Sequence, residues 1–428
     1  MSEKAAPTGF WPRAVRSLLF WVIIAIALGA LLGQFLPSWA IVPFATFNDI
    51  FGKYLSFAVP MIIVGLVTPA IFDIGRSAGK WLLTTALIAY GSTMFAGFGT
   101  YFLAKAIYPS LLKGQQVPDL ATPENAVASL IDPSFTMPPV FGVMTALILA
   151  FVLGIGMSAT RAHRMMELFT EFRELIMLVI TKSIVPLLPL HIFGIFLNMS
   201  KSGQFVDVIV AMGKVILFSF AITAVLLLIQ YAIAGSIGKV NPLKSLWGMR
   251  DAYVTALGTA SSAATIPVTL RCAKKNGVTE EIADFVIPLC ATIHLAGSTI
   301  KITAFAMALQ YMMGITPTFS SMAGFIAMLG IIMVAAPGVP GGAITAAQGT
   351  LHSMLGFTDP MYGIMVAMYV AVDSFGTATN VTGDGAIAIV VDKLSAGTLG
   401  TEKEATMAAM EDIVESRELQ DGPMHSNL

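Results

Sequence analysis

Long apolar runs alternate with short polar segments along most of the chain. A helix of roughly 20 apolar residues is long enough to cross about 30 Å of hydrocarbon. The first half of the chain contains six such runs after a short segment 1–16, and each run is predicted to be a transmembrane span. The first is predicted to be a retained helix rather than a cleaved signal peptide. The six spans are predicted at 17–36, 45–72, 81–107, 139–160, 174–199 and 205–236.

Basic residues between the spans indicate their orientation, because cytoplasmic loops retain lysine and arginine. They follow the second, fourth and sixth spans: Arg76, Lys80, Arg161, Arg164, Arg173, Lys239, Lys244 and Arg250. The loops after the first and third spans hold one lysine between them, Lys113. The N-terminus is therefore predicted to be cytoplasmic.

Two later apolar segments are interrupted near their middles. The first, "DAYVTALGTASSAATIPVTL", has basic residues on both sides, and its centre, "TASSAATIP", is rich in small residues and ends in Pro267. The chain is thus predicted to enter and leave the membrane on one side, as a helical hairpin over about 243–276. The second, "GFIAMLGIIMVAAPGVPGGAITAAQGTLHSMLG", is broken at its proline and glycine cluster and predicts a hairpin over about 318–356.

Each broken segment is followed by a span that carries polar residues. Span seven is predicted at about 282–312 and span eight at about 360–392, before a cytoplasmic tail, 396–428. Paired hydrophobic segments interrupted by glycine and proline are typical of secondary transporters, whose sites lie where the broken segments meet. A passive channel is disfavoured, because both broken segments have the character of gates around an occluded site.

Span eight carries a polar stripe, "DSFGTATNVTGD". Asp373, Thr377, Asn380 and Asp384 are spaced by four, three and four residues, which places them on one helix face. A carboxylate in the membrane is costly and normally faces a cavity where it binds something. The alternative is that these polar residues only hydrogen-bond between helices. For Thr377 considered by itself, this alternative is as good as a binding role. The stripe favours a site for a zwitterion and a cation.

Composition agrees with a polytopic membrane protein and removes other classes. The 428 residues are 56% hydrophobic and 11% charged, with a formal net charge of −1. This charge gives no support for nucleic-acid binding, which needs a concentrated basic face. The two cysteines, Cys272 and Cys290, cannot form a disulfide framework or a cysteine zinc cluster. No cofactor is expected apart from a coupling sodium ion or proton.

Four motifs in order resemble the dicarboxylate/amino acid:cation symporter family, the glutamate-transporter superfamily. They are "SSAATIPVTLRCAKKNG" from Ser261, "HLAGS" from His294, "PGVPGGA" from Pro337 and the stripe from Asp373. The resemblance covers roughly 45–395. It implies an all-α membrane fold with eight transmembrane helices and two re-entrant hairpins, assembled as a homotrimer in the inner membrane.

The resemblance also implies a division of labour between two domains. Spans one, two, four and five would form a scaffold. Spans three and six, together with residues 241–395, would form a transport domain that moves past this scaffold like an elevator. The substrate would be a small molecule carried across the lipid bilayer, with both termini cytoplasmic.

Site residues are implied by matching the family motifs position by position. Asp373 would hold the substrate's amino group, Asn380 its carboxylate, and Thr377 would line the side-chain end. The remaining substrate-binding residues would be Ser261, Ser262, Ser298, Val339, Pro340, Gly341 and Gly376. Asn380, Asp384 and the backbone of Cys290 would form a cation site beside His294.

The chain departs from the family pattern at three points. Gly376 and Ala260 stand where the family places an arginine for an acidic side chain, which favours a small neutral amino acid over a dicarboxylate. His294 and Ala296 stand where the family places two sodium ligands. Because an imidazole can carry a proton near neutral pH, His294 is a candidate proton carrier. A neutral histidine that only packs the segment is the alternative.

Lys301 and the function as a whole leave alternatives open. Lys301 either extends towards the outer interface or provides a fixed positive charge in place of a lost cation. The main prediction is a symporter for neutral amino acids, and the second is a dicarboxylate or acidic amino-acid symporter using Lys301 or Arg271. A third is an intramembrane enzyme, disfavoured because Asp373 and Asp384 would lie about 16 Å apart along one helix.

Overall fold

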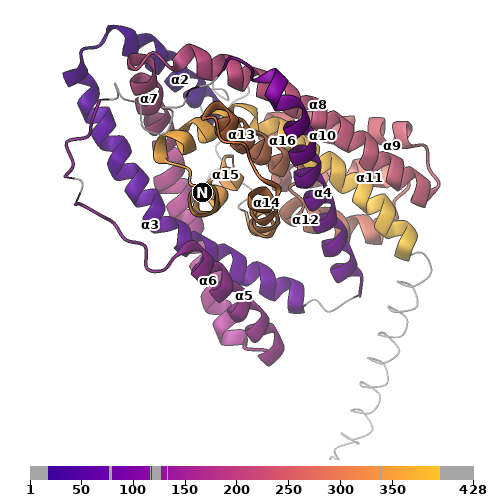
Figure 1. Cartoon of the computed structure of the whole chain (residues 1–428). Helices are drawn as coiled ribbons and strands as arrows, with labels where there is room; N and C mark the ends of the chain where they lie inside the picture. Colours follow the sequence, from indigo (N-terminus) through magenta and orange to yellow (C-terminus); the bar gives the residue numbers. More distant parts are fainter. Residues whose placement is uncertain are drawn as a thin grey trace, which may run out of the picture.

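The computed structural model describes residues 18–76, 80–115, 117, 127–132, 134–336 and 340–395, and every regular element in these residues is helical (Figure 1). The first half contains α2 (Leu18–Phe35), α3 (Ser38–Arg76), α4 (Lys80–Leu111), α5 (Val143–Thr160), α6 (His163–Val179), the π-helical turn η2 (Ile180–Ile184), α7 (Val185–Lys201) and α8 (Phe205–Gly238). The predicted segments 1–16 and 396–428 lie outside the described residues.

These helices confirm the all-α prediction and adjust two boundaries. The second span begins at Ser38 rather than at 45, and the fifth runs from His163 rather than from 174, through η2 into α7. The early turns of α6 carry charged residues such as Arg164 and Glu167, so an apolar run could not reveal them. Among the described helices, seven stretches are long and apolar enough to cross a membrane. The predicted fourth span, α5, is not among these seven.

The first hairpin consists of α9 (Pro242–Gly248), α10 (Arg250–Thr259) and α11 (Ser262–Lys275). Its turn lies at Ala260, whose φ of 48° is in the left-handed region, and Ser261 then caps α11 by accepting from the Ala264 amide at 3.3 Å. Pro267 lies inside α11. The predicted interruption is confirmed, and its physical cause is the turn at Ala260 rather than the proline.

Span seven is broken, and a second hairpin follows it. α12 (Glu280–Ile293) and α13 (Ala296–Met312) are separated by His294 and Leu295, which have non-helical backbone angles. The second hairpin pairs α14 (Phe319–Val334) with α15 (Gly342–Leu355), and α16 (Asp359–Ser395) follows it as span eight. Residues 337–339 between the arms lie outside the described residues.

The helices pack in two groups. α2 packs on α7, with Gly29 and Gly33 allowing the close approach, and α3 packs on α5, α6 and α7. The other group surrounds α16, which contacts α8, α10, α11, α12 and α13, while α4 packs on α13 and α14. In Figure 1, α13 to α16 lie at the centre, with α3 on the left and α9 and α11 on the right.

The outer surface is strongly apolar. Large hydrophobic side chains are exposed along α2, α4 and α8, among them Leu31, Leu87, Phe102 and Leu217. Soluble proteins rarely expose such continuous apolar surface, whereas lipid tails solvate it. The chain is therefore a multi-pass membrane protein whose polar side chains are collected inside, around α16.

Candidate functional site

A small cavity lies where the tips of the two hairpins approach α13 and α16. Its volume is about 30 Å³, room for one or two water molecules. The described residues that line it are Ala260, Ser262, Ala291, Leu295, Ser298, Ala336, Ala343, Tyr369, Asp373, Thr377 and Asn380. The structure thus brings together five predicted substrate-binding residues: Ser262, Ser298, Asp373, Thr377 and Asn380.

Asp373 connects α16 to the second hairpin. Its Oδ2 accepts a hydrogen bond from the Gly341 amide at 2.8 Å, and the Tyr369 hydroxyl also hydrogen-bonds to its carboxylate. Gly341 has a φ of 75°, a conformation that glycine adopts without strain, and this turn aims its N–H at the carboxylate. Asp373 is 7% exposed and lines the cavity. One end of the cavity is therefore formed by a carboxyl group.

Asn380 and Ser298 form the second polar group in the cavity. The Asn380 Oδ1 accepts from the Gly297 amide at 2.8 Å, and its Nδ2 lies 3.5 Å from the Ser298 hydroxyl. The break at His294 and Leu295 leaves the amides at the start of α13 without partners in their own helix, and Asn380 satisfies one of them. The hydrogen bond between Gly297 and Asn380 holds the start of α13 against α16. The next residue, Ser298, lies on the cavity wall, where it also hydrogen-bonds to Tyr369.

The other predicted substrate residues have different positions. Ser261 caps α11 and is not among the cavity-lining residues, and neither are Pro340 and Gly376. Val339 lies outside the described residues. These positions leave the assignment of Ser261, Pro340 and Gly376 to the substrate as a prediction.

His294 and Asp384 form a buried pair behind the cavity. The His294 Nδ1 lies 2.9 Å from Asp384 Oδ1, and its Nε2 lies 3.1 Å from the Ser92 hydroxyl. Gln230 of α8 donates to the same hydroxyl at 2.7 Å. Asp384 is 0% exposed, and its second oxygen, Oδ2, has no hydrogen-bond partner among the described residues. The imidazole of His294 therefore hydrogen-bonds to one oxygen of the Asp384 carboxylate, and the other oxygen is available for a cation.

The predicted cation ligands are only partly assembled. Asp384 lies one helical turn beyond Asn380 on α16, but Asn380 Oδ1 is hydrogen-bonded to Gly297. The Cys290 carbonyl accepts from the His294 amide at 2.9 Å, which follows from the end of α12 at this point. The arrangement offers one free carboxylate oxygen and two carbonyl-type oxygens that already have one partner each.

Lys301 is buried inside the helix bundle rather than extended to the membrane surface. Its side chain is 1% exposed, its ammonium donates to the Val372 carbonyl of α16, and it interacts electrostatically with Asp373. Of the two alternatives for Lys301, extension towards the outer interface is therefore wrong. Gly376 provides the room, because a Cβ there would lie 2.5 Å from the Lys301 Nζ.

Several residues of the site were not singled out in the sequence. Tyr369 lies four residues before Asp373, so extending the stripe by one turn would have found it. Ser92 and Gln230 come from α4 and α8, and they meet His294 only through the packing of three distant segments. No local pattern could have paired them.

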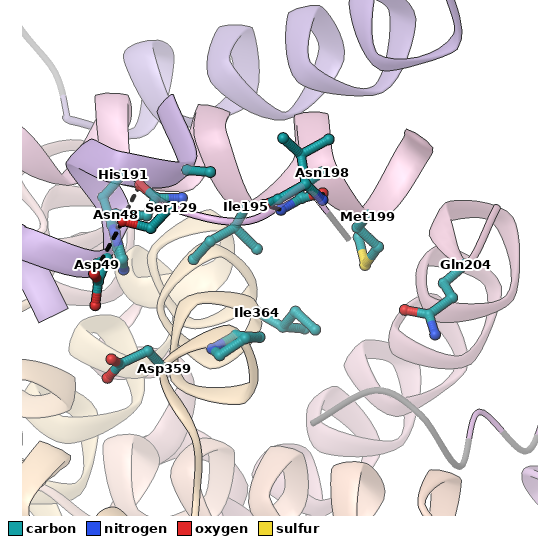
Figure 2. Close-up of a pocket in the computed structure, with 13 residues that line it drawn as sticks. Asn48, Asp49, Ser129, His191, Ile195, Asn198, Met199, Gln204, Asp359 and Ile364 are labelled. Atoms are coloured by element: carbon teal, nitrogen blue, oxygen red, sulfur yellow. Dashed lines mark hydrogen bonds between the residues drawn. The ribbon is translucent and has the colours of Figure 1, made fainter. Parts of the chain in front are cut away.

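A second cavity of about 240 Å³ lies at the boundary between the two helix groups (Figure 2). Asn48 and Asp49 of α3 and His191 of α7 line one side, and Asp359 and Ile364 of α16 line the other (Figure 2). His191 Nδ1 and Asn48 Oδ1 are 3.1 Å apart. The residues predicted for substrate or cation binding are absent from its described lining.

Two broken, inward-facing segments, a central polar helix and a cavity lined by the Asp373 carboxylate together define a secondary membrane transporter. Residues 18–394 match the model of the sodium:dicarboxylate symporter family. The chain belongs to this family.

Two curated relatives match nearly the whole chain. A serine/threonine transporter SstT of Acinetobacter baumannii (strain AYE) is 27% identical over 398 residues, covering 88% of this chain and 96% of the relative. A serine/threonine transporter SstT of Streptococcus thermophilus (strain CNRZ 1066) is 26% identical over 399 residues, covering 90% and 97%. These findings confirm the predicted family and a symporter rather than an enzyme, and the prediction of an amino acid:cation symporter agrees with them. The family name implies sodium as a coupling ion.

Proposed function

We propose that this protein carries a small neutral amino acid across the membrane together with a cation. The observation that carries the proposal is the buried Asp373 carboxylate, which faces a cavity also lined by Ser298 and Asn380. A carboxylate is the natural partner of a substrate ammonium group, and hydroxyl and amide groups can donate to the substrate's carboxylate. The relatives named as serine/threonine transporters support an amino acid of this size.

An acidic substrate is disfavoured by what lines the cavity. No arginine or lysine is among its described lining residues, and Ala260 and Gly376 stand at the two positions where the family pattern expects a guanidinium. Arg271, considered as a substitute, is exposed on α11. A second carboxylate in this site would be buried without a partner, which is costly.

The coupling cation is assigned to the neighbourhood of Asp384. Its free Oδ2 can coordinate a sodium ion with help from the Asn380 side chain and the Cys290 carbonyl, as the family name supports. The hydrogen bond from His294 to Oδ1 supports a proton at the same place, because an imidazole and a carboxylate can share one. Either cation would neutralise a carboxylate that is otherwise uncompensated.

Movement of the substrate is assigned to the two helix groups. In this proposal α2, α3, α5, α6 and α7 form the scaffold, and α4 together with α8 to α16 forms the transport domain. The cavity in Figure 2 lies on the boundary between them, and this gap between the groups supports a boundary along which they could move. The homotrimer, the inner membrane and the cytoplasmic termini belong to the same proposal.

Equilibrium binding to the purified protein tests the substrate class. Labelled L-serine should bind and be displaced by L-alanine and L-threonine. N-acetyl-serine, which lacks the ammonium group, and succinate should not displace it. Displacement by succinate together with weak binding of all the amino acids would contradict the proposal and favour a dicarboxylate carrier.

A further inference from the structure

Lys301 is held in the centre of the proposed transport domain by the crossing of two helices. α13 and α16 meet at Gly297 and Gly376, where a Cβ on Gly297 would lie 2.7 Å from the Gly376 carbonyl oxygen. Lys301 lies one turn further along α13, so its side chain enters the space that Gly376 leaves open. Its ammonium reaches the Val372 carbonyl on the far side.

The Lys301 ammonium is fixed by the packing of its neighbours and is shielded from solvent. Lys301 is 1% exposed and is among the largest fully buried side chains of the described residues. Lysine is almost never fully buried unless a partner compensates its charge. Here the compensation comes from the Val372 carbonyl and from the nearby carboxylate of Asp373.

The buried charges of the described residues can be counted. Apart from His191 and His294, the buried side chains of acidic and basic residues are Lys301, Asp373 and Asp384. All three lie on α13 or α16. If all three groups are ionised, two carboxylates and one ammonium leave one uncompensated negative charge. A zwitterionic substrate adds none. One further cation, at Asp384, therefore completes a neutral loaded domain.

Neutrality matters because the loaded domain has to pass through the low-dielectric part of the membrane. A net charge there is unfavourable, so a carrier moves fastest when its bound charges cancel. We propose that the Lys301 ammonium takes the place of one coupling cation, so that one cation accompanies each zwitterionic substrate. This inference rests on the proposed function and specifies its stoichiometry.

The direct test is the charge moved per substrate molecule, obtained from reversal potentials of labelled serine flux in proteoliposomes. The unmodified protein should move one positive charge per serine. A ratio of two or more would overturn the inference while leaving amino-acid symport intact. Absence of serine flux would contradict the proposed function instead.

Variants locate the effect at the ammonium. Lys301→Met keeps the length of the side chain and removes its charge, so turnover should fall by about tenfold or more. Serine affinity should stay equal or increase, because Asp373 loses a competing cation. A merely structural role would weaken binding and turnover together. The control is Lys214→Met, since Lys214 is a half-buried lysine of α8 that also donates to a carbonyl, that of Leu111. It should leave both quantities near those of the unmodified protein.

If Lys301→Met is unstable, a second set of variants tests the same inference by moving the positive charge from α13 to α16. Lys301→Ala should lose turnover, and Lys301→Ala/Gly376→Lys should recover much of it, because the new side chain fills the vacated space and restores the net charge. Only the Lys301 ammonium lies under 3 Å from the position of a Cβ on Gly376 among the described residues. Unchanged turnover and charge ratio in Lys301→Met, or no recovery in the double variant, would overturn the inference.

Discussion

α13 and α16 make a tight backbone contact at Gly297, and adding one methyl group there tests how the site is assembled. In Gly297→Ala the new Cβ would lie 2.7 Å from the Gly376 carbonyl oxygen, 2.8 Å from Thr379 Cβ and 3.1 Å from Asn380 Oδ1. The first of these atoms belongs to the backbone of α16 and cannot rotate away. α13 and α16 must therefore separate.

The expected cost follows from two opposing effects. Overpacking a tight interior costs about 1 to 3 kcal/mol, and a weakened hydrogen bond between Gly297 and Asn380 adds about 1 kcal/mol. The better helix propensity of alanine returns about 1 kcal/mol or less, since Gly297 lies in the first turn of α13. The net destabilisation should be about 1 to 4 kcal/mol, together with a displaced Asn380 and weaker substrate binding.

Thermal unfolding of the purified protein and serine binding measure these effects. Gly99→Ala is a matched control, because Gly99 lies in the membrane helix α4 and a methyl group added at that position would meet no described atom within 4 Å. The control should be as stable as the unmodified protein or more so. Equal stability and equal serine affinity in the two variants would refute the argument that the α13–α16 crossing positions the site.

Three further changes probe other parts of the account. Asp373→Asn should weaken serine binding by roughly 10-fold to 150-fold, since a hydrogen bond to a charged group contributes about 1.5 to 3 kcal/mol. Gly383→Ala should alter the cation dependence of uptake, because the new Cβ would lie 2.6 Å from the His294 ring. The affinity for serine at a saturating cation concentration should stay unchanged. Cysteines replacing Gly52 and Asp359, which touch across the two helix groups, should stop uptake when cross-linked by a mercury reagent.

Two of these changes have a matched comparison. Asp207→Asn removes an exposed carboxylate at the start of α8 and should leave serine binding unaltered. For the cross-link, a cysteine pair at Gly33 and Ser200 lies within one helix group and should leave uptake intact. Continued uptake with the Gly52–Asp359 pair fully cross-linked would contradict sliding between the groups. A Gly383→Ala protein with unaltered cation dependence would remove His294 from the cation site.

Much of the fold could be predicted from the sequence because the signals are local. Apolar runs predict α2, α4 and α8 to within a few residues, and the breaks before α11 and α13 follow from small or polar residues. The stripe of α16 is equally local, since a helical period alone puts Asp373 and Asn380 on one face. The charged early turns of α6 have no apolar signature, so that helix was underestimated.

The site's long-range contacts could not be predicted in the same way. The depth of Lys301 depends on a missing side chain at Gly376 on another helix, and its carbonyl partner lies 71 residues away in sequence. Ser261 and Ser262 are adjacent and chemically identical, yet one caps α11 and the other lines the cavity. The turn at Ala260 decides which serine caps the helix and which lines the cavity, and a shift of this turn by one residue would exchange their roles.

The most direct test of the central claim is accumulation of labelled substrate by proteoliposomes under separate sodium and proton gradients. The account predicts that serine or alanine accumulates above its external concentration when one of these gradients is imposed. It also predicts that Asp373→Asn strongly reduces the accumulation at a low serine concentration. Accumulation of succinate but not of serine or alanine would contradict the substrate class, and equal uptake without any cation gradient would contradict symport.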